Sequence, residues 1–189
     1  YTSDEEIFKS GIIKRESKGC ISLSKLGILL FDFFDEFFLS IIKDETYEMR
    51  QFPTLLNTDV LNSTNYISTS PQYIMFCSRV KETVSEYENL QKKYFTKKIN
   101  TSLSYPTYAL SPSACFHLYQ SIKAKKIKGN SIFTLKQNVF RNEGRFNWGE
   151  IERLQDYHVR EIVMIGNHDY VVDKREMFIN KSMELLEIL

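Results

Sequence analysis

The chain lacks the cysteine pattern of a disulfide-stabilised protein. Its three cysteines, Cys20, Cys77 and Cys115, are odd in number, lie far apart and form no C-x-x-C pair. Small secreted domains that depend on disulfides carry even sets of cysteines. The sequence therefore predicts a reduced, cytoplasmic protein. No signal peptide is visible, and because the first residue is Tyr1 rather than Met, we expect a fragment of a longer protein.

A large net charge and a long apolar run are also missing. The 25 Lys and Arg against 24 Asp and Glu give a net charge of +1. A dedicated nucleic-acid-binding protein, with its broad basic field, is therefore not favoured. The longest apolar stretch is interrupted by Asp32, Asp35 and Glu36, which excludes a membrane span. Because repeats, low-complexity tracts and linkers are absent, we predict one domain over residues 1–189.

Hydrophobic periodicity predicts an α+β domain. The strongest pattern covers residues 24–43, where Leu and Phe recur at helical spacing behind Ser24 as N-cap. This apolar stripe is wide, so we expect the helix to be buried on more than one side, against the sheet and against a partner subunit. The other main expected elements are strands over 47–52 and 105–110, a capped helical turn over 58–61, a charged, solvated connector helix over 81–98, a helix from Ser111 as N-cap to Lys126, and a final helix capped by Asp173.

The most unusual stretch is a charge-rich hairpin. Its first strand leads through Val139 into Phe140-Arg-Asn-Glu-Gly-Arg-Phe146, and its return strand covers Tyr157–Gly166. Ionised side chains on a buried face are costly unless they are paired. Two interpretations stay open: a surface hairpin with solvated charges, or a polyphosphate site built from Arg side chains.

Three segments of the chain resemble class II aminoacyl-tRNA synthetases. Phe140 to Glu143 resembles the second signature motif of that family, and a helix followed by a strand ending at Pro53 matches the order of the first motif. Ser111–Tyr119 and Arg153–Gly166 look most like the zinc-dependent seryl-type branch, which includes atypical archaeal seryl-tRNA synthetases and amino acid:carrier-protein ligases. The resemblance implies an antiparallel sheet flanked by helices. The chain ends at Leu189, before the third motif, so we expect the C-terminal part of this fold to be lacking.

The resemblance also implies ATP, with Mg²⁺, as a ligand. Activation of an amino acid brings its carboxylate onto the α-phosphate of ATP, so the enzyme must position and neutralise two anions. By resemblance, Arg141 is the catalytic residue on the α-phosphate, Glu143 accepts from the adenine amino group and Tyr157 stacks on adenine. Arg153 would reach the β- and γ-phosphates; a solvated loop charge is the alternative. Because Glu143 follows Arg141 by two residues, we expect both on one face of one strand.

Two further residues are metal candidates only through the resemblance. Taken alone, Cys115 is a small buried hydrophobe and Glu161, beside Arg160, is half of an ion pair. The zinc-dependent branch takes a Cys and a Glu from these two places and a second Cys further along the chain. The resemblance therefore implies Zn²⁺ that holds the substrate amino group at an open coordination position. The third ligand does not occur before Leu189.

Three functions follow as alternatives. The first is ATP-dependent activation of a small amino acid, followed by transfer to the phosphopantetheine thiol of a carrier protein. This acceptor is favoured over tRNA because the chain carries no added tRNA-binding arm and little net charge. The second is a fragment of a true seryl-like aminoacyl-tRNA synthetase, and the third is a catalytically inactive paralogue. We also expect a homodimer, in which the helix of residues 24–43 packs against the partner subunit.

Overall fold

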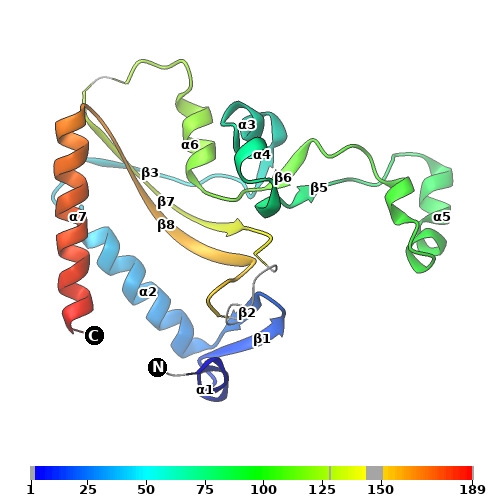
Figure 1. The fold of residues 1–189 in the computed structure, drawn as a ribbon, viewed down its shortest axis with the longest axis horizontal. Coiled ribbons are helices and arrows are strands. Elements are labelled where there is room, and N and C mark those ends of the chain that lie inside the picture. Colours follow the sequence, from blue (N-terminus) through cyan, green and yellow to red (C-terminus); the bar gives the residue numbers. More distant parts are fainter. Residues whose placement is uncertain (1–2, 128, 144–150, 189) are drawn as a thin grey trace.

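The structure is a computed structural model, and it describes residues 3–127, 129–143 and 151–188. Its centre is a three-stranded sheet in the order β3 (Tyr47–Arg50), β7 (Ser131–Phe140) and β8 (Asp156–Ile165). Strands β7 and β8 form the predicted antiparallel hairpin, while β3 runs parallel to β7 (Figure 1). Most of the polar loop between β7 and β8, residues 144–150 with Arg145 and Trp148, lies outside the described residues.

Helices cover both faces of this sheet (Figure 1). Helix α6 (Cys115–Ile122) packs on one face, where Leu118 joins Phe133 and Leu135 in a buried cluster. Helices α2 (Lys25–Ser40) and α7 (His168–Ile188) lie on the other face and meet through stacked rings of Phe38 and Phe178, with centroids 6.1 Å apart. The side chains of a strand alternate between faces, so neighbouring residues of β8 serve opposite sides of the molecule.

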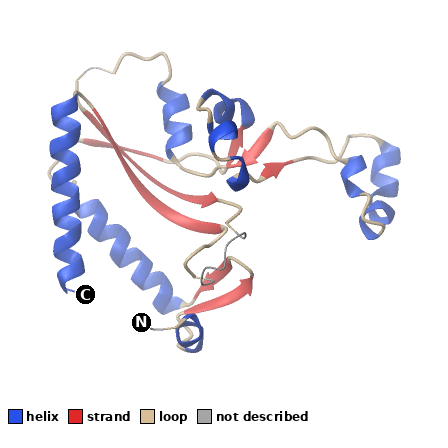
Figure 2. Cartoon of the chain, in the orientation of Figure 1, coloured by secondary structure: helices blue, strands red, loops and turns tan. Residues whose placement is uncertain are grey.

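A second, smaller sheet adjoins the first (Figure 2). It has the order β4 (Leu55–Asn57), β6 (Tyr108–Leu110) and β5 (Phe76–Cys77), and both pairings are antiparallel. The short helices α3 (Thr58–Ser63), α4 (Tyr66–Thr69) and η1 (Pro71–Tyr73) pack beside it. Leu56, Leu61 and Ala109 make its buried core, so this region has an apolar cluster separate from that under α6.

The N-terminal segment forms helix α1 (Asp4–Lys9) and the hairpin of β1 (Ile13–Ser17) with β2 (Cys20–Leu23). A further segment carries α5 (Val84–Phe95) and η2 (Ile99–Ser102) at the end of a long extension, seen at the right of Figure 1. No helix among the described residues is both long and apolar enough to span a membrane.

Helix α2 begins as predicted, but the single chain does not cover its apolar stripe. Its N-cap is Ser24, whose hydroxyl accepts from the amide of Gly27, as predicted. Its apolar stripe, however, is not buried on several sides within the chain: Gly27 is its only buried residue, and Leu29 and Phe33 are 55% and 52% exposed. Periodicity identifies an apolar face but does not say whether the same chain covers it.

Two predicted helix starts are also wrong. The hydroxyl of Ser111 donates to the carbonyl of Ser113 instead of capping a helix, and α6 begins only at Cys115 and ends at Ile122. Helix α7 begins at His168 with Asp173 inside it. The residue that accepts from its first turn is Asn167, whose side-chain oxygen lies 2.9 Å from the amide of Tyr170.

Candidate nucleotide and metal site

The predicted ATP-binding residues converge at the end of the hairpin. Arg141, Glu143, Arg153 and Tyr157 line a single pocket of about 250 Å³, together with the intervening segment 151–154. Strand β7 ends at Phe140, so Arg141 and Glu143 follow the strand and do not share one of its faces, contrary to the expectation. The amide of Glu143 donates to the carbonyl of Arg141 at 2.8 Å, and this tight turn returns both residues to the pocket.

Arg141 is held by three separate contacts. Its Nε donates to the carbonyl oxygen of Pro112 at 2.9 Å, and its backbone amide donates to the carbonyl of Gln155 at 3.0 Å. The guanidinium carbon lies 5.9 Å from the centroid of the Tyr157 ring. These contacts fix the direction of the guanidinium while leaving its other N–H groups to meet an anion.

The N-terminal hairpin contributes to this positioning. The tip of β1–β2 accepts from Gln155, whose backbone amide donates to the Gly19 carbonyl at 2.6 Å and whose side chain donates to the Lys18 carbonyl at 3.0 Å. A Cβ on Gly19 would lie 2.8 Å from Cγ of Gln155, and Gly19 has φ +72°. Glycine is therefore required where the hairpin meets the segment that holds Arg141.

Glu143 is buried and paired. One of its carboxylate oxygens lies 3.5 Å from a guanidinium nitrogen of Arg153, which is itself partly exposed. A buried carboxylate needs such a partner. The structure therefore brings together two residues that the sequence treated separately, and the adenine-binding and phosphate-binding roles given to them stay predictions.

Two tyrosines that sequence reasoning missed lie beside this pocket. The pKa of Tyr66, from α4, is raised by burial, and the charges of Arg141 and Glu143 both act on it. The carbonyl of Tyr73, from η1, accepts from the amide of Asn142 at 3.0 Å. Burial likewise raises the pKa of Tyr157, so the phenols of Tyr66 and Tyr157 stay neutral. No motif or periodic pattern marks Tyr66 or Tyr73, because both approach from a region about 70 residues away in sequence.

The two metal candidates lie side by side. Oε1 of Glu161 accepts from the Ser113 hydroxyl at 2.7 Å and from the Ala114 amide at 2.8 Å, and Oε2 accepts from the Cys115 amide at 2.8 Å. The carboxylate thus serves as the cap of α6 from outside the helix. Negative charge at a helix N-terminus is favourable, so Glu161 has a structural role whether or not a metal is present.

The thiol of Cys115 belongs to the same cluster. Its sulfur lies 3.3 Å from the hydroxyl oxygen of Ser113. Burial raises the pKa of Cys115, and the adjacent carboxylate of Glu161 raises it further. The pKa of Tyr119 is raised to about 12 by burial and by its neighbours Cys115 and Glu161. A bound metal cation would instead lower the pKa of the Cys115 thiol, because metals bind the thiolate.

Cys115 and Glu161 supply the donor types that Zn²⁺ prefers. In the part of the chain that the structure describes, however, no three His, Cys, Asp or Glu side chains gather as a metal-binding group. These two residues supply two donors, fewer than the three protein ligands of a zinc site with one open position, so zinc binding here stays a prediction. Tyr157 and Glu161 are four residues apart on one face of β8, about 13 Å along the strand.

On the opposite face of β8, Arg160 forms an ion pair with helix α2. Arg160 donates through Nε and a terminal nitrogen to the two carboxylate oxygens of Asp35 in α2, at 2.7 and 2.9 Å. Lys136 lies 3.1 Å from the same carboxylate. On the same face, His158 contacts Phe31 of α2 with ring centroids 5.3 Å apart. These charges are part of the structure and not of the pocket.

Comparison with solved structures defines the class of fold. M. kandleri SerRS, solved in complex with A. aeolicus tRNASec, matches 97% of the chain with a TM-score of 0.81 at 16% identity. Giardia lamblia prolyl-tRNA synthetase, solved in complex with prolyl-adenylate, matches 94% with a TM-score of 0.70 at 13% identity. The chain spans 37% and 33% of these two structures. It therefore has the α+β fold of a class II aminoacyl-tRNA synthetase-like catalytic domain, as predicted.

Sequence comparison points to relatives that are amino acid ligases. No family model matches the chain. Amino acid–[acyl-carrier-protein] ligases 1 and 2 of Bradyrhizobium diazoefficiens are each 26% identical over 73% and 76% of the chain. The type-2 serine–tRNA ligase of Methanothermobacter thermautotrophicus is 21% identical over 82%. The chain spans 42%, 43% and 32% of the lengths of these relatives.

Proposed function

We propose that the protein activates a small amino acid with ATP and passes the aminoacyl group to the phosphopantetheine thiol of a carrier protein. The observation that carries this proposal is the convergence of Arg141, Glu143, Arg153 and Tyr157 on one pocket. The amino acid–[acyl-carrier-protein] ligases among the relatives support the choice of acceptor. Residues 1–189 would form one catalytic domain.

In the first step an oxygen of the amino acid carboxylate attacks the α-phosphorus of ATP. The bond from this phosphorus to the bridging oxygen breaks, and pyrophosphate leaves. Arg141, oriented by Pro112 and Tyr157, lies against the α-phosphate and neutralises charge in the transition state. Glu143 and Tyr157 bind adenine, while Arg153 exchanges its contact with Glu143 for the β- and γ-phosphates. Mg²⁺ accompanies the nucleotide.

In the second step the carrier thiol attacks the carbonyl carbon of the adenylate, a thioester forms and AMP leaves. Cys115 and Glu161 would provide two ligands to Zn²⁺, which when bound holds the substrate amino group and so selects α-amino acids. The raised pKa of the Cys115 thiol means that metal uptake releases its proton. Substitution of Cys115 by Ser should abolish zinc uptake, measured as metal content after dialysis.

The proposal includes a homodimer in the cytoplasm. The exposed apolar side of α2, with Leu29 and Phe33, supplies a surface that a second copy would cover. The three free thiols agree with a reducing compartment. Sedimentation of the purified protein measures the oligomeric state, and Phe33→Asp is expected to yield monomer.

Amino-acid-dependent exchange of radiolabelled pyrophosphate into ATP tests the proposed chemistry. The complete gene product should catalyse exchange without tRNA, and Arg141→Ala should reduce it by about 100- to 1,000-fold because it removes a charge-stabilising donor. The exposed Arg175, paired with Glu176 on α7, provides a matched control: Arg175→Ala should leave exchange unchanged. Absence of exchange in the wild-type protein with zinc present would favour an inactive paralogue.

The type-2 serine–tRNA ligase among the relatives favours a second candidate, a seryl-like tRNA synthetase. The two candidates share the first step and differ in the acceptor. Transfer of labelled amino acid to holo carrier protein supports the first, and transfer to tRNA with no transfer to carrier protein supports the second.

A further inference from the structure

Residues 79–104 form an extension, here called the arm, that carries α5 and η2 away from the rest of the structure (Figure 1). Its base is a short two-stranded neck. The amide of Ser104 donates to the carbonyl of Arg79 and that of Lys81 to the carbonyl of Ser102, both at 2.8 Å, while Val80 pairs with Leu103. The arm is thus fixed at its base by backbone hydrogen bonds.

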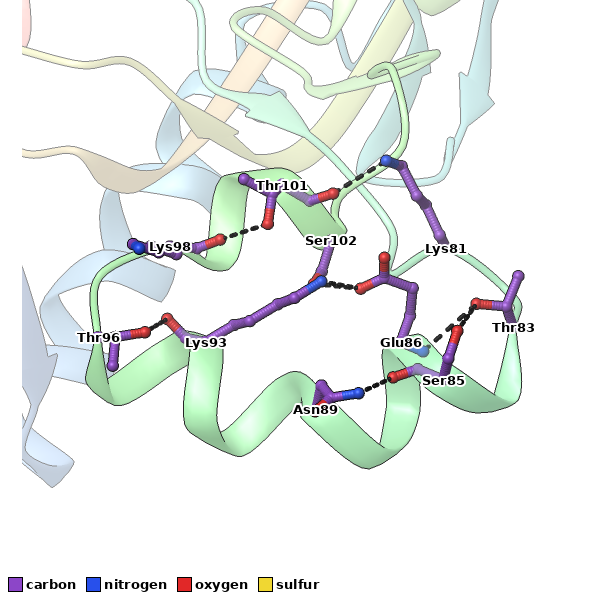
Figure 3. Close-up of polar contacts among 10 residues, drawn as sticks. All are labelled: Lys81, Thr83, Ser85, Glu86, Asn89, Lys93, Thr96, Lys98, Thr101 and Ser102. Carbon is purple, nitrogen blue, oxygen red and sulfur yellow. Dashed lines mark hydrogen bonds and ion pairs between the residues drawn. The ribbon is translucent and has the colours of Figure 1, made fainter.

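Polar contacts join the elements of the arm (Figure 3). Oε2 of Glu86 accepts from the hydroxyl of Ser102 and from Nζ of Lys93, each at 2.5 Å. Ser102 is fully buried, and Nζ of Lys81 donates to the carbonyl of Thr101 at 2.9 Å. These contacts hold α5 against η2 and lower the pKa of Glu86. The arm therefore keeps its shape through hydrogen bonds and an ion pair.

The outside of α5 is apolar. Val84, Tyr87, Tyr94 and Phe95 are all exposed, the last two at 63% and 73%. At 3.6 residues per turn, these four lie within an arc of about 100°. The helix thus reverses the usual amphipathic arrangement, in which the apolar side faces inward. The sequence correctly predicts a helix here, but not that its solvent side carries aromatic rings.

Lysines surround the aromatic end of α5. Lys92, Lys97 and Lys98 are exposed, and residues 79–98 contain six Lys or Arg against three Glu. The amides of Lys97 and Lys98 donate to the carbonyls of Tyr94 and Lys93, which closes a Schellman turn. Lys97 adopts φ +58° in the position that normally belongs to glycine, at a cost of about 1–2 kcal/mol. Position 97 thus carries a lysine although glycine would make the backbone more stable there.

We propose that the end of the arm, formed by Lys92, Tyr94, Phe95, Lys97 and Lys98, docks the acidic face of a protein partner. Resting on the proposed function, that partner is the carrier protein. Exposed aromatic side chains are common binding hot spots. The lysines around them complement an acidic surface. The apolar arc continues through Tyr87 to Val84, giving the partner a ridge to pack on.

The arrangement of the rings favours a protein over RNA. Tyr94 and Phe95 pack edge to face, with centroids 5.7 Å apart and an interplanar angle of 75°. Their planes are therefore not parallel, and the two rings form one ridge. Single-stranded nucleic acid stacks its bases on ring faces, which this arrangement does not offer side by side. Three lysines also provide few phosphate contacts for a nucleic acid.

Fluorescence anisotropy with a labelled acidic holo-acyl-carrier protein tests the docking surface. Lys97→Gly removes a charge and relieves the positive φ, so it should keep or raise the unfolding midpoint while weakening binding. The pair Tyr94→Ala and Phe95→Ala should weaken binding by about tenfold or more. Lys98→Glu should also weaken binding, because it reverses a charge on the docking surface. Its matched control is Lys125→Glu, at an exposed lysine after α6, which should bind normally.

The same variants should retain pyrophosphate exchange, because exchange does not involve the carrier. If the wild-type protein shows no exchange, the proposed function fails, while loss of carrier binding in the arm variants would still support the docking surface. The proposed docking surface is wrong if wild type, Lys97→Gly and the double alanine variant bind the carrier protein equally. Arm-dependent binding of a single-stranded RNA, with no binding of the carrier protein, overturns it as well.

Discussion

Arg160 and Glu161 are neighbours on β8, and each directs its charge to an opposite face of the sheet. Arg160 meets a countercharge: both carboxylate oxygens of Asp35 accept from it, and the two side chains are only 9% and 10% exposed. Glu161 meets neutral donors, namely one hydroxyl and two backbone amides. Strand β8 thus carries a neutralised charge on its α2 side and, on its α6 side, an anion whose partners among the described residues are neutral dipoles.

The difference separates a charge that is paired with an opposite charge from one that meets only neutral donors among the described residues. An ion pair that satisfies both partners has no remaining need of a ligand, and its hydrogen bonds lower the pKa of Asp35. The carboxylate of Glu161 instead raises the pKa of the adjacent Cys115, because thiolate and carboxylate would repel each other. A cation would relieve that repulsion. The α6 side is therefore the side on which the proposed metal would bind.

Breaking the pair on the α2 side should have the largest effect. Asp35→Ala leaves Arg160 buried without its partner, which costs about 3–5 kcal/mol of unfolding free energy. Urea denaturation followed by circular dichroism measures this loss. The double variant Asp35→Leu with Arg160→Met should recover most of it, because apolar residues of similar size replace both charges. A double variant as unstable as the single one would contradict this account.

Removing the charge on the α6 side should cost less. In Glu161→Gln one amide oxygen can still accept, but the new NH₂ group faces a backbone amide of the α6 N-terminus. One donor is then unsatisfied, which costs about 1–3 kcal/mol. Zinc affinity should fall in the same variant, whereas Asp35→Leu with Arg160→Met should bind zinc normally. Unchanged stability of Glu161→Gln would show that the carboxylate does not cap α6.

Acid titration should distinguish the two sides more finely. The pKa of Asp35 is lowered in the folded state, so its pair contributes stability above its unfolded pKa of about 3.9. That contribution disappears as pH falls through the lowered folded pKa. Between about pH 5 and 2, the unfolding free energy of the wild type should therefore drop more steeply than that of the charge-free double variant. Parallel curves for the two proteins would remove Asp35 from the acid transition.

On both sides of β8, the sequence predicts the local elements but not the contacts between them. The ends of β8, the N-cap Ser24 and the presence of α5 follow from local patterns. The cap of α6 does not, because Glu161 reaches it from 46 or 47 residues away, and the serine-proline signal at Ser111 misleads. The partner of Arg160 lies 125 residues away in α2. Local periodicity carries no information about such pairings.

The candidate site shows the same limit. Resemblance in short segments identified Arg141, Glu143, Arg153 and Tyr157, and the structure places all four around one pocket. Their contacts with each other were not predictable, because the chain leaves β7 before Arg141 and folds back within two residues. The apolar outer side of α5 was missed for a related reason: a hydrophobic period does not distinguish a side that meets the core from one that meets solvent.

The smallest expected effect concerns the reactivity of Cys115. Burial and the Glu161 carboxylate keep its pKa raised, so the thiol is mostly protonated at pH 8 and should react slowly with iodoacetamide. In a background with Cys20→Ser and Cys77→Ser, Glu161→Gln should speed alkylation by about two- to tenfold, since it removes the charge contribution and leaves the burial. Asp35→Leu with Arg160→Met changes charges on the other side of the sheet and should leave the rate unchanged. Equal acceleration in both variants would mean that general loosening exposes the thiol, and the electrostatic distinction between the two sides of β8 would then be wrong.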